Sequence, residues 1–497
     1  MTQPTETPSR ERTFLGQPWG LANLFGVEMW ERFSFYGMQS LLAFYLYYSV
    51  GEGGLGVNEG TALAIVGAYG GFVYMMALVA SFISDRILGP ERTLFYSAIL
   101  VMVGHIALAL LPGFFGLTLG LVCVGLGSGG VKTAAQVVLG DLYTREDPKR
   151  DSGFSIFYMA VNIGALFGPL LTGWAWGFEN FHRGFGLAAI GMALGLTQYV
   201  LMRKTTIGVA GATVPSPLPR SHYMAWIIGA LAIIAVAVGV LTSGILPLDK
   251  LPWVMTLIAL AVSIVMIYQM CTSELTSAVE RSRVLGFIPL MVGCVLFFAI
   301  FQSQFTVLAL YTDKRVNLDI NLGFVEGTLS PNFIQSINPL FIVIFSGIFA
   351  AAWTKLAERQ WSSPVKFAVA MCIIGASLFL FLPYVGGGPK STPLLMMVLL
   401  LFLFTMGELL LSPIGNSLAT KVAPEAFKSR MFAAWLMGVS MGSSLSGILG
   451  GKYEAAMTAG AAAERTFFLT TGIGAIVLGL IIFAARGWVL KKFVDVR

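Results

Sequence analysis

Charged residues are scarce in this chain of 497 residues. They make up 11% of the sequence, whereas a soluble globular domain carries about 25%. Hydrophobic residues make up 56%, and the mean hydropathy is +0.80, which excludes a soluble domain for most of the chain. Lipid offers no water to backbone polar groups, so segments that cross it are helices or a closed barrel. The apolar segments lack the period-two alternation of barrel strands and therefore predict helices.

Cysteine and histidine are also rare, with four and three residues respectively. Cys123, Cys271, Cys294 and Cys372 lie in apolar segments without the spacing of metal ligands, which favours small buried side chains. No nucleophile–base pair stands out, so we expect neither an enzyme nor a bound metal or organic cofactor. The polar N-terminal residues lack the apolar core of a cleavable signal peptide.

Fourteen apolar segments are long enough to cross a bilayer, which takes roughly 20 residues of helix. They fall at about 22–48, 60–84, 93–111, 114–138, 153–176, 184–202, 223–244, 253–271, 285–310, 332–356, 366–385, 393–418, 430–452 and 466–486. The sequence therefore predicts an all-α polytopic membrane protein with 14 transmembrane helices.

Basic residues are distributed unevenly between the loops. With the N-terminus in the cytoplasm, 22 of the 31 Lys and Arg residues lie on the cytoplasmic side and 7 on the other, while Arg32 and Lys132 lie within spans. Because cytoplasmic loops are enriched in Lys and Arg, this split predicts that both termini are cytoplasmic. The excess positive charge then faces anionic membrane lipids, so nucleic acid is not an expected partner.

The chain divides around a segment rich in Pro, Gly and Thr. Residues 205–222 are typical of a linker; before it we expect a cytoplasmic tail at 1–20 and six spans in 21–204. After it we expect an inserted helix pair in 223–272, six spans in 284–487 and a cytoplasmic tail at 488–497. Two six-helix bundles plus two inserted helices predict the major facilitator fold, with the substrate cavity between the bundles. We expect a functional monomer.

Few ionisable side chains lie inside the spans, where each costs about 2.5–3.5 kcal/mol on insertion scales and therefore points to function. Glu28, Glu31 and Arg32 share one helix face. Two carboxylates beside one guanidinium can hold a variable proton, and the alternative is a structural ion network. His105 is a weaker candidate, for which a hydrogen-bonded structural role is favoured.

Two further charges lie apart from this cluster. Lys132 follows a glycine-rich run, 125–130, in which Gly125 and Gly129 are more typical of close helix packing than of a nucleotide-binding loop. Glu408 is the only carboxylate within the spans of the second half. A zwitterion fits these charges, with its carboxylate near Arg32 or Lys132 and its ammonium near Glu408; the alternative is a permanent bridge between Glu408 and one of the cations. Without an ATP-binding domain, energy is expected from an ion gradient.

Several segments carry recognisable motifs. They are Glu28 to Met38 (an ExxERF-type pattern), Lys132 with 140–143, Phe157 to Pro169, Ser336 to Pro339, Gly407 to Gly415, and Trp435. Together they resemble the signatures of the proton-dependent oligopeptide transporter family over about residues 18–490, including the inserted pair of bacterial members. The resemblance implies a proton-coupled symporter that imports di- and tripeptides across a bacterial plasma membrane, with protons as the coupling ion.

The resemblance also implies residue roles. Proton coupling falls to Glu28, Glu31, Arg32 and Lys132. The peptide pocket comprises Arg32, Tyr36, Tyr74, Lys132, Asn162, Phe298, Gln302, Asn338, Glu408 and Trp435.

Four positions depart from the family pattern. Phe35 replaces a Tyr, Gln39 replaces an Arg, and Phe298 and Gln302 replace a Trp and a Glu. Because Gln302 cannot titrate, we expect Lys132 to pair with Glu28 or Glu31, or with substrate. A proton-coupled transporter of another small solute, such as a modified peptide, amino acid derivative or drug, is the alternative function. A membrane sensor is a more distant one.

Overall fold

The computed structural model describes residues 12–144, 147, 149–178, 180–321, 326–356 and 359–494. Parts of the two expected tails, 1–11 and 495–497, lie outside them. The described helices are α1 (Gly20–Tyr47), α2 (Glu59–Ile83), α3 (Pro90–Leu110), α4 (Gly113–Gly140), α5 (Arg150–Trp176), α6 (Phe181–Thr206), α7 (Tyr223–Thr242), α8 (Leu251–Thr272), α9 (Ala278–Phe301), α10 (Val307–Arg315), α11 (Ile337–Leu356), α12 (Ser363–Ser377), α13 (Leu394–Lys421), α14 (Lys428–Ala459) and α15 (Ala461–Phe493).

Short elements connect these helices. The short helical segments are η1 (Val50–Glu52), η2 (Ser84–Leu88), η3 (Arg220–His222), η4 (Leu248–Lys250), η5 (Gln302–Phe305), η6 (Pro331–Ser336), η8 (Leu378–Tyr384) and η9 (Glu425–Phe427). The strands β1 (Thr13–Phe14) and β2 (Gln17–Pro18) pair antiparallel, as do β4 (Asp319–Asn321) and β5 (Glu326–Thr328), whereas β3 (Val316–Asn317) pairs parallel with β6 (Thr392–Pro393).

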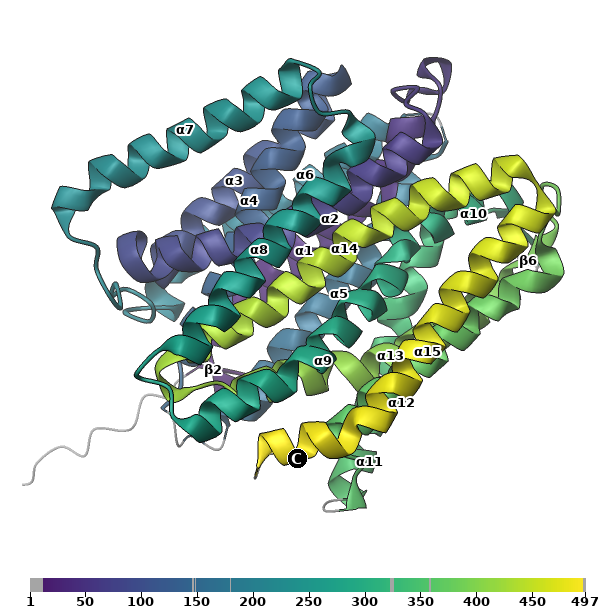
Figure 1. The fold of residues 1–497 in the computed structure, drawn as a ribbon. Coiled ribbons are helices and arrows are strands. Elements are labelled where there is room, and N and C mark those ends of the chain that lie inside the picture. Colours follow the sequence, from purple (N-terminus) through teal and green to yellow (C-terminus); the bar gives the residue numbers. More distant parts are fainter. Residues whose placement is uncertain are drawn as a thin grey trace, which may run out of the picture.

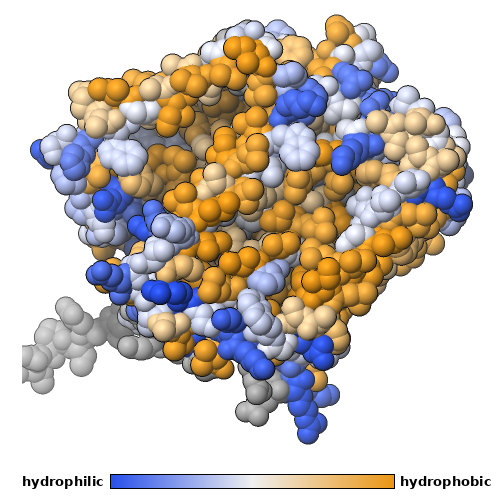
Figure 2. Space-filling view, viewed as in Figure 1, coloured by the Kyte–Doolittle hydropathy of each residue, from blue (hydrophilic) through white to orange (hydrophobic). Residues whose placement is uncertain are grey.

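The prediction of an all-α polytopic membrane protein is confirmed. Thirteen helical segments in the described part of the chain are long and apolar enough to cross a membrane. The first helix, α1, is 28 residues long but less apolar, because it carries Glu28, Glu31 and Arg32. Orange, apolar residues run across the middle of the face in Figure 2, and hydrophilic residues gather toward its ends.

The helices form two bundles that meet along α2 and α14. In the first bundle α1 packs against α5 and α6, and α4 packs against α2 and α3; in the second, α15 packs against α12 and α9, and α13 against α11 and α12.

The predicted packing role of the glycine run is confirmed. A Cβ at Gly129 would lie 2.7 Å from the backbone nitrogen of Ala77 on α2, and one at Gly125 would lie 2.6 Å from Cε1 of Phe72 on the same helix.

Two spans expected as single helices are interrupted. The span expected at 285–310 is α9, then the 3-10 turn η5, then α10, and the span expected at 366–385 is α12 followed by η8. Thr306, with φ −124° and ψ −86°, separates η5 from α10. At the C-terminus α15 continues to Phe493, into the segment expected as a tail, because Val489 and Phe493 are fully buried.

The inserted pair has two unlike members. Helix α8 lies between α2 of the first bundle and α14 of the second and packs against both, with Ala259 beside Met437 and Met441. Helix α7 stands apart from the bundles (Figure 1) and buries no residue among those described.

The segment between the halves is hydrogen-bonded to the first bundle rather than freely extended. The backbone nitrogens of Ser216 and Leu218 donate to the carbonyls of Asp85 and Arg86, at 2.9 and 2.8 Å. Gly211, at φ +68°, donates to the Asp141 carboxylate at 3.1 Å. The left-handed conformation favours glycine at this point, so the chain is held against the end of the bundle.

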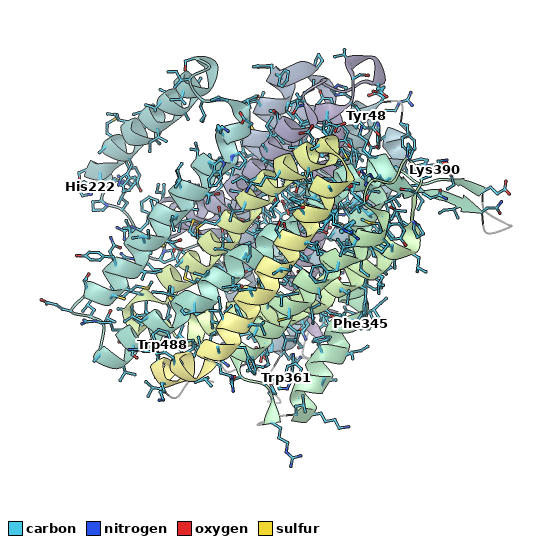
Figure 3. All side chains as sticks on the ribbon, turned by 45° about the vertical axis from the view of Figure 1, so that its right-hand side comes forward. Tyr48, His222, Phe345, Trp361, Lys390 and Trp488 are labelled. Carbon is cyan, nitrogen blue, oxygen red and sulfur yellow. The ribbon has the colours of Figure 1, made fainter. Side chains whose placement is uncertain are left out.

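The two ends of the molecule are distinct. Tyr48 and Lys390 lie at one end, and Trp361 and Trp488 lie at the opposite end (Figure 3). At the Tyr48 end, the fully buried Glu464 accepts bonds from Arg315 Nη1 at 2.7 and 2.8 Å, from the Gly386 backbone nitrogen at 2.8 Å and from the Tyr453 hydroxyl at 3.2 Å. This ion pair ties α10, α15 and the loop after η8 together.

Candidate functional site

A cavity of about 340 Å³ lies between the two bundles. It brings together nine of the ten predicted substrate-binding residues, with Glu28: the nine are Arg32, Tyr36, Tyr74, Lys132, Asn162, Phe298, Gln302, Asn338 and Glu408. A second cavity of about 360 Å³ shares Tyr74, Lys132, Phe298 and Glu408, and includes the tenth residue, Trp435.

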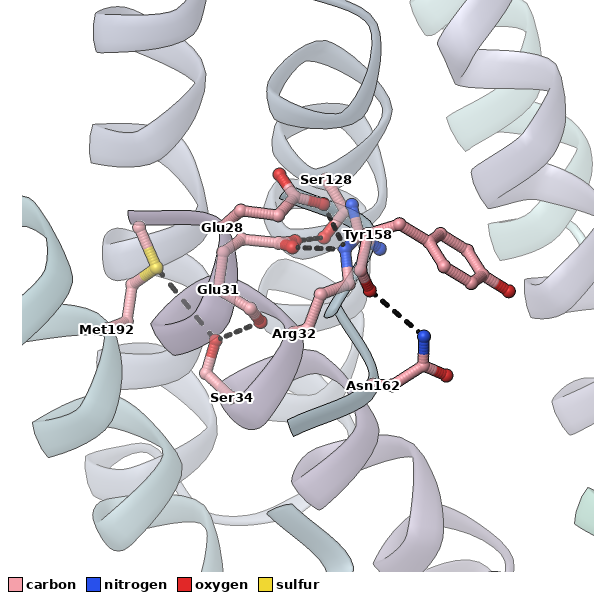
Figure 4. Close-up of polar contacts among 8 residues, drawn as sticks. All are labelled: Glu28, Glu31, Arg32, Ser34, Ser128, Tyr158, Asn162 and Met192. Atoms are coloured by element: carbon pink, nitrogen blue, oxygen red, sulfur yellow. Dashed lines mark hydrogen bonds and ion pairs between the residues drawn. The ribbon is translucent and has the colours of Figure 1, made fainter. Parts of the chain in front are cut away.

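The charged cluster on α1 comprises Glu28, Glu31 and Arg32, of which Glu28 and Arg32 border the cavity. Arg32 Nε lies 2.9 Å from Glu28 Oε1 and 2.9 Å from Glu31 Oε2, so one guanidinium serves two carboxylates (Figure 4). Glu28 borders the cavity, whereas Glu31 is fully buried behind it. Glu31 Oε1 accepts a hydrogen bond from the Ser128 hydroxyl on α4, a partner that sequence spacing did not identify because it lies on another helix.

Lys132 is held by an aromatic ring. Its Nζ lies 4.5 Å from the centre of the Tyr74 ring, an arrangement in which the ring face attracts the ammonium. The pairing expected with Glu28 or Glu31 is not formed: among the described residues, no carboxylate lies within ion-pair distance of Lys132. The other alternative, an anionic group of the substrate, remains a prediction.

The second bundle supplies the opposite charge. Asn338 Nδ2 donates to Glu408 Oε2 at 3.0 Å and to Thr405 Oγ1 at 2.9 Å. This amide orients the carboxylate without neutralising it. A permanent bridge from Glu408 to Arg32 or Lys132 is not present in the part of the chain that the structure describes. Glu408 thus faces the cavity across from the cations of α1 and α4.

Two predicted pocket residues donate hydrogen bonds to other protein groups nearby. Asn162 donates to the backbone oxygen of Tyr158 in its own helix, at 2.9 Å. Trp435 is 1% exposed, and its Nε1 donates to Asn416 Oδ1 at 2.7 Å. Asn416 borders both cavities but carries no motif, so the sequence did not single it out.

Contacts between the bundles close one side of the cavity. The hydroxyls of Tyr47 and Tyr48 donate to Asp313 at 2.9 and 2.6 Å, and Lys314 pairs with Glu59 at 2.8 Å. Asn332 of η6 reaches into the first bundle and donates to Ser40 Oγ at 3.0 Å. These residues all lie toward the Tyr48 end of the molecule.

The α2–α14 seam continues this closure. A Cβ on Gly67 would overlap the backbone of Gly447, and Ser440 Oγ donates to the backbone oxygen of Gly71 at 2.7 Å. Toward the opposite end, the cavities are bordered by the exposed residues Gln136 and Asn416.

Gln302, where the family pattern has a carboxylate, donates through Nε2 to Ser443 Oγ at 3.1 Å. We expect Gln302→Glu to shift the pH profile of transport by about 0.5–1 unit, because it places a titratable anion in the same cavity as Lys132. Initial uptake rates between pH 5 and 8 measure this shift. Gln269→Glu, which adds the same charge at an exposed position of α8 outside both cavities, is the matched control. An unshifted profile for Gln302→Glu means that this position does not couple to Lys132.

Comparison with known proteins gives one consistent family. The POT family model PTR2 matches residues 91–466. The chain is 36% identical to a di-/tripeptide transporter of Lactococcus lactis subsp. cremoris, over 98% of this chain and 99% of the relative.

Two solved structures are similar over nearly the whole chain. The crystal structure of a peptide transporter POT in complex with sulfate matches with a TM-score of 0.90 and 39% identity, over 97% of both chains. A POT family transporter in complex with 5-aminolevulinic acid matches with a TM-score of 0.90 and 34% identity, over 96% of this chain and 98% of that one. These matches confirm the two-bundle transporter fold of the major facilitator type and a membrane location, and the chain belongs to the POT family of proton-dependent oligopeptide transporters.

Proposed function

We propose that this protein is a proton-coupled symporter that imports di- and tripeptides into a bacterial cell by alternating access. The observation that carries the proposal is one cavity with opposite charges on its two walls. Arg32 and Lys132 on the first bundle face Glu408, oriented by Asn338, on the second. A peptide with free ends carries matching charges, so its carboxylate and ammonium can bridge the bundles.

The cluster on α1 supplies the proton site in this proposal. With both carboxylates ionised, Arg32 is shared; protonation of one leaves a neutral pair with the other. Protons are then the coupling ion, and no cofactor is needed. With both termini in the cytoplasm, the contacts at Tyr47, Tyr48 and Asp313 close the outer side, and the described state opens inward. A functional monomer completes the proposal, since the cavity is built from one chain.

A second candidate is a proton-coupled transporter of another small zwitterion. The similar structure with 5-aminolevulinic acid favours it, because the same pair of charged walls suits an amino acid derivative. Competition between Ala-Ala and 5-aminolevulinic acid in one uptake assay ranks the two substrates.

The energetics give the first test of the proposal. In proteoliposomes, accumulation of Ala-Ala is expected to follow an inside-negative potential and an outside-acid pH. One charge crossing 100 mV gains about 2.3 kcal/mol, and one pH unit adds about 1.4 kcal/mol, a tenfold gain in accumulation. A protonophore is expected to abolish the accumulation driven by the potential and by the pH difference. Uptake that ignores the protonophore and needs Na⁺ or ATP contradicts proton coupling.

Glu408 gives a test of substrate recognition. A charge-assisted bond between its carboxylate and the peptide ammonium contributes about 1.5–3 kcal/mol. Glu408→Gln is therefore expected to weaken binding of Ala-Ala by roughly tenfold or more, and to matter far less for N-acetyl-Ala-Ala, which has no ammonium. Equilibrium binding to the purified protein measures both ligands. Equal losses for the two ligands assign Glu408 to a structural role.

A further inference from the structure

Three glutamines line the cavity toward its closed side. Gln39 lies on α1, Gln304 on η5 and Gln335 on η6, and all three border the cavity. They are 5%, 4% and 4% exposed. Both η5 and η6 pack against α1, and the bond from Asn332 to Ser40 ties η6 to α1 at the residue next to Gln39.

This end of the cavity is separated from the charged groups. Gln39 follows Arg32 by seven residues, or about 10 Å along the helix, in the direction of Tyr47 and Tyr48. Gln335 lies three residues before Asn338, on the side of the closing contacts. The charged groups that border the cavity, Glu28, Arg32, Lys132 and Glu408, come from α1, α4 and α13. A peptide whose two ends bridge those charges has its side chains free to reach the glutamines.

Two of the glutamines have unsatisfied acceptors. Gln39 Oε1 and Gln335 Oε1 are buried and accept no hydrogen bond from the residues that the structure describes. A buried acceptor without a donor is unfavourable, so these oxygens favour a ligand group that donates. An amide also offers donors of its own and carries no net charge.

We propose that Gln39, Gln304 and Gln335 form a side-chain subsite that selects an uncharged hydrogen-bonding side chain, above all a primary amide, over a carboxylate of the same shape. The inference rests on the proposed peptide transport. A glutamine side chain donates to the free oxygens and accepts from the amide nitrogens. A glutamate side chain only accepts, so the two oxygens stay unpaired and its charge is buried without a cation beside it.

The test compares isosteric dipeptides without an ion gradient. Ala-Gln and Ala-Glu compete with labelled Ala-Ala for counterflow in proteoliposomes, at pH 7.5 on both sides and at zero membrane potential. We expect Ala-Gln to compete about tenfold better than Ala-Glu, the effect of one to two hydrogen bonds. Equal competition by the two overturns the subsite. Absence of Ala-Ala counterflow, by contrast, overturns the proposed function itself.

Two arginine variants separate the subsite from the general charge of the cavity. Gln39→Arg supplies the missing cation and is expected to reverse the preference, so that Ala-Glu competes better than Ala-Gln. Gln136→Arg adds the same charge at the exposed border and is expected to keep the wild-type ratio. If both variants change the ratio equally, the discrimination is a property of the whole cavity and the subsite is wrong.

Replacing Gln335 by an apolar residue of similar size tests the unpaired oxygens directly. Gln335→Leu is expected to weaken competition by Ala-Gln about fivefold while Ala-Ala competes as before. Retained Ala-Ala counterflow shows that the variant is folded. If Ala-Gln is unaffected in Gln335→Leu, the Gln335 amide does not contact the side chain and the proposal fails. If Gln335→Leu is unfolded, the reversal in Gln39→Arg decides the proposal alone.

Discussion

Replacing Glu31 by Gln is expected to abolish proton-driven accumulation of peptide while counterflow persists. Glu31 is fully buried, bonded to Ser128 and 2.9 Å from Arg32, so a glutamine fits the same space and imitates the protonated acid permanently. A site that cannot release its proton carries none across the membrane. Counterflow needs no net proton movement, and so it survives. The two assays on the same proteoliposomes give the readout.

The control for this variant is another ion-paired glutamate in the same bundle. Glu91 pairs with Arg203 at 3.0 Å, away from the cavity, and Glu91→Gln is expected to accumulate peptide as wild type does. Glu28→Gln is expected to resemble Glu31→Gln in a milder form. Normal accumulation in both Glu28→Gln and Glu31→Gln moves the proton site elsewhere. His105, fully buried with neither ring nitrogen bonded to a described residue, is then the next to test.

Replacing Arg315 by Met is expected to destabilise the protein by about 3–5 kcal/mol, the usual effect of removing one partner from a buried ion pair. The change leaves the Glu464 carboxylate charged and fully buried, with the Gly386 nitrogen and the Tyr453 hydroxyl as its donors. Thermal unfolding in detergent, followed by tryptophan fluorescence, measures the loss.

A second substitution and an exposed pair give the controls. In the double variant Arg315→Met with Glu464→Gln, no charge is buried and the amide oxygen still accepts from Gly386, so at least half of the lost stability is expected to return. The Lys390–Asp319 pair is exposed, and Lys390→Ala is expected to change stability by about 1 kcal/mol or less. Equal losses in Arg315→Met and Lys390→Ala mean that the buried pair contributes no more than a surface one.

The sequence predicted the helices well because each span must satisfy its own backbone in lipid, and apolar length records that requirement. It also identified the charges of the site, since an ionisable residue within a span is costly and rare. Glu28, Arg32, Lys132 and Glu408 were found in this way, and the structure places all four at one cavity.

Contacts between helices could not be predicted from the sequence. Whether Lys132 meets a carboxylate or the Tyr74 ring depends on how α2 and α4 are rotated about their axes, which hydropathy does not record. The break at η5 was also missed, because residues 302–306 contain neither proline nor glycine. The amide end of the cavity went unnoticed except for Gln39, since Gln304 and Gln335 lie in turns and carry no charge.

The seam between α2 and α14 has a consequence for motion. Where Gly67 lies against Gly447, and Ser440 bonds to the Gly71 carbonyl, the helices touch through backbone and hydroxyl groups. Parting them at this point exposes little hydrocarbon, so the penalty of about 25 cal/mol per Å² of exposed apolar surface is small here. It applies further along the same seam, where Met75 and Leu78 pack against Met437 and Met441. Water can replace the hydrogen bond from Ser440 to the Gly71 carbonyl when the helices separate. Resistance to opening at the Tyr48 end therefore comes mainly from the polar contacts of Asp313 with Tyr47 and Tyr48 and from the Lys314–Glu59 pair.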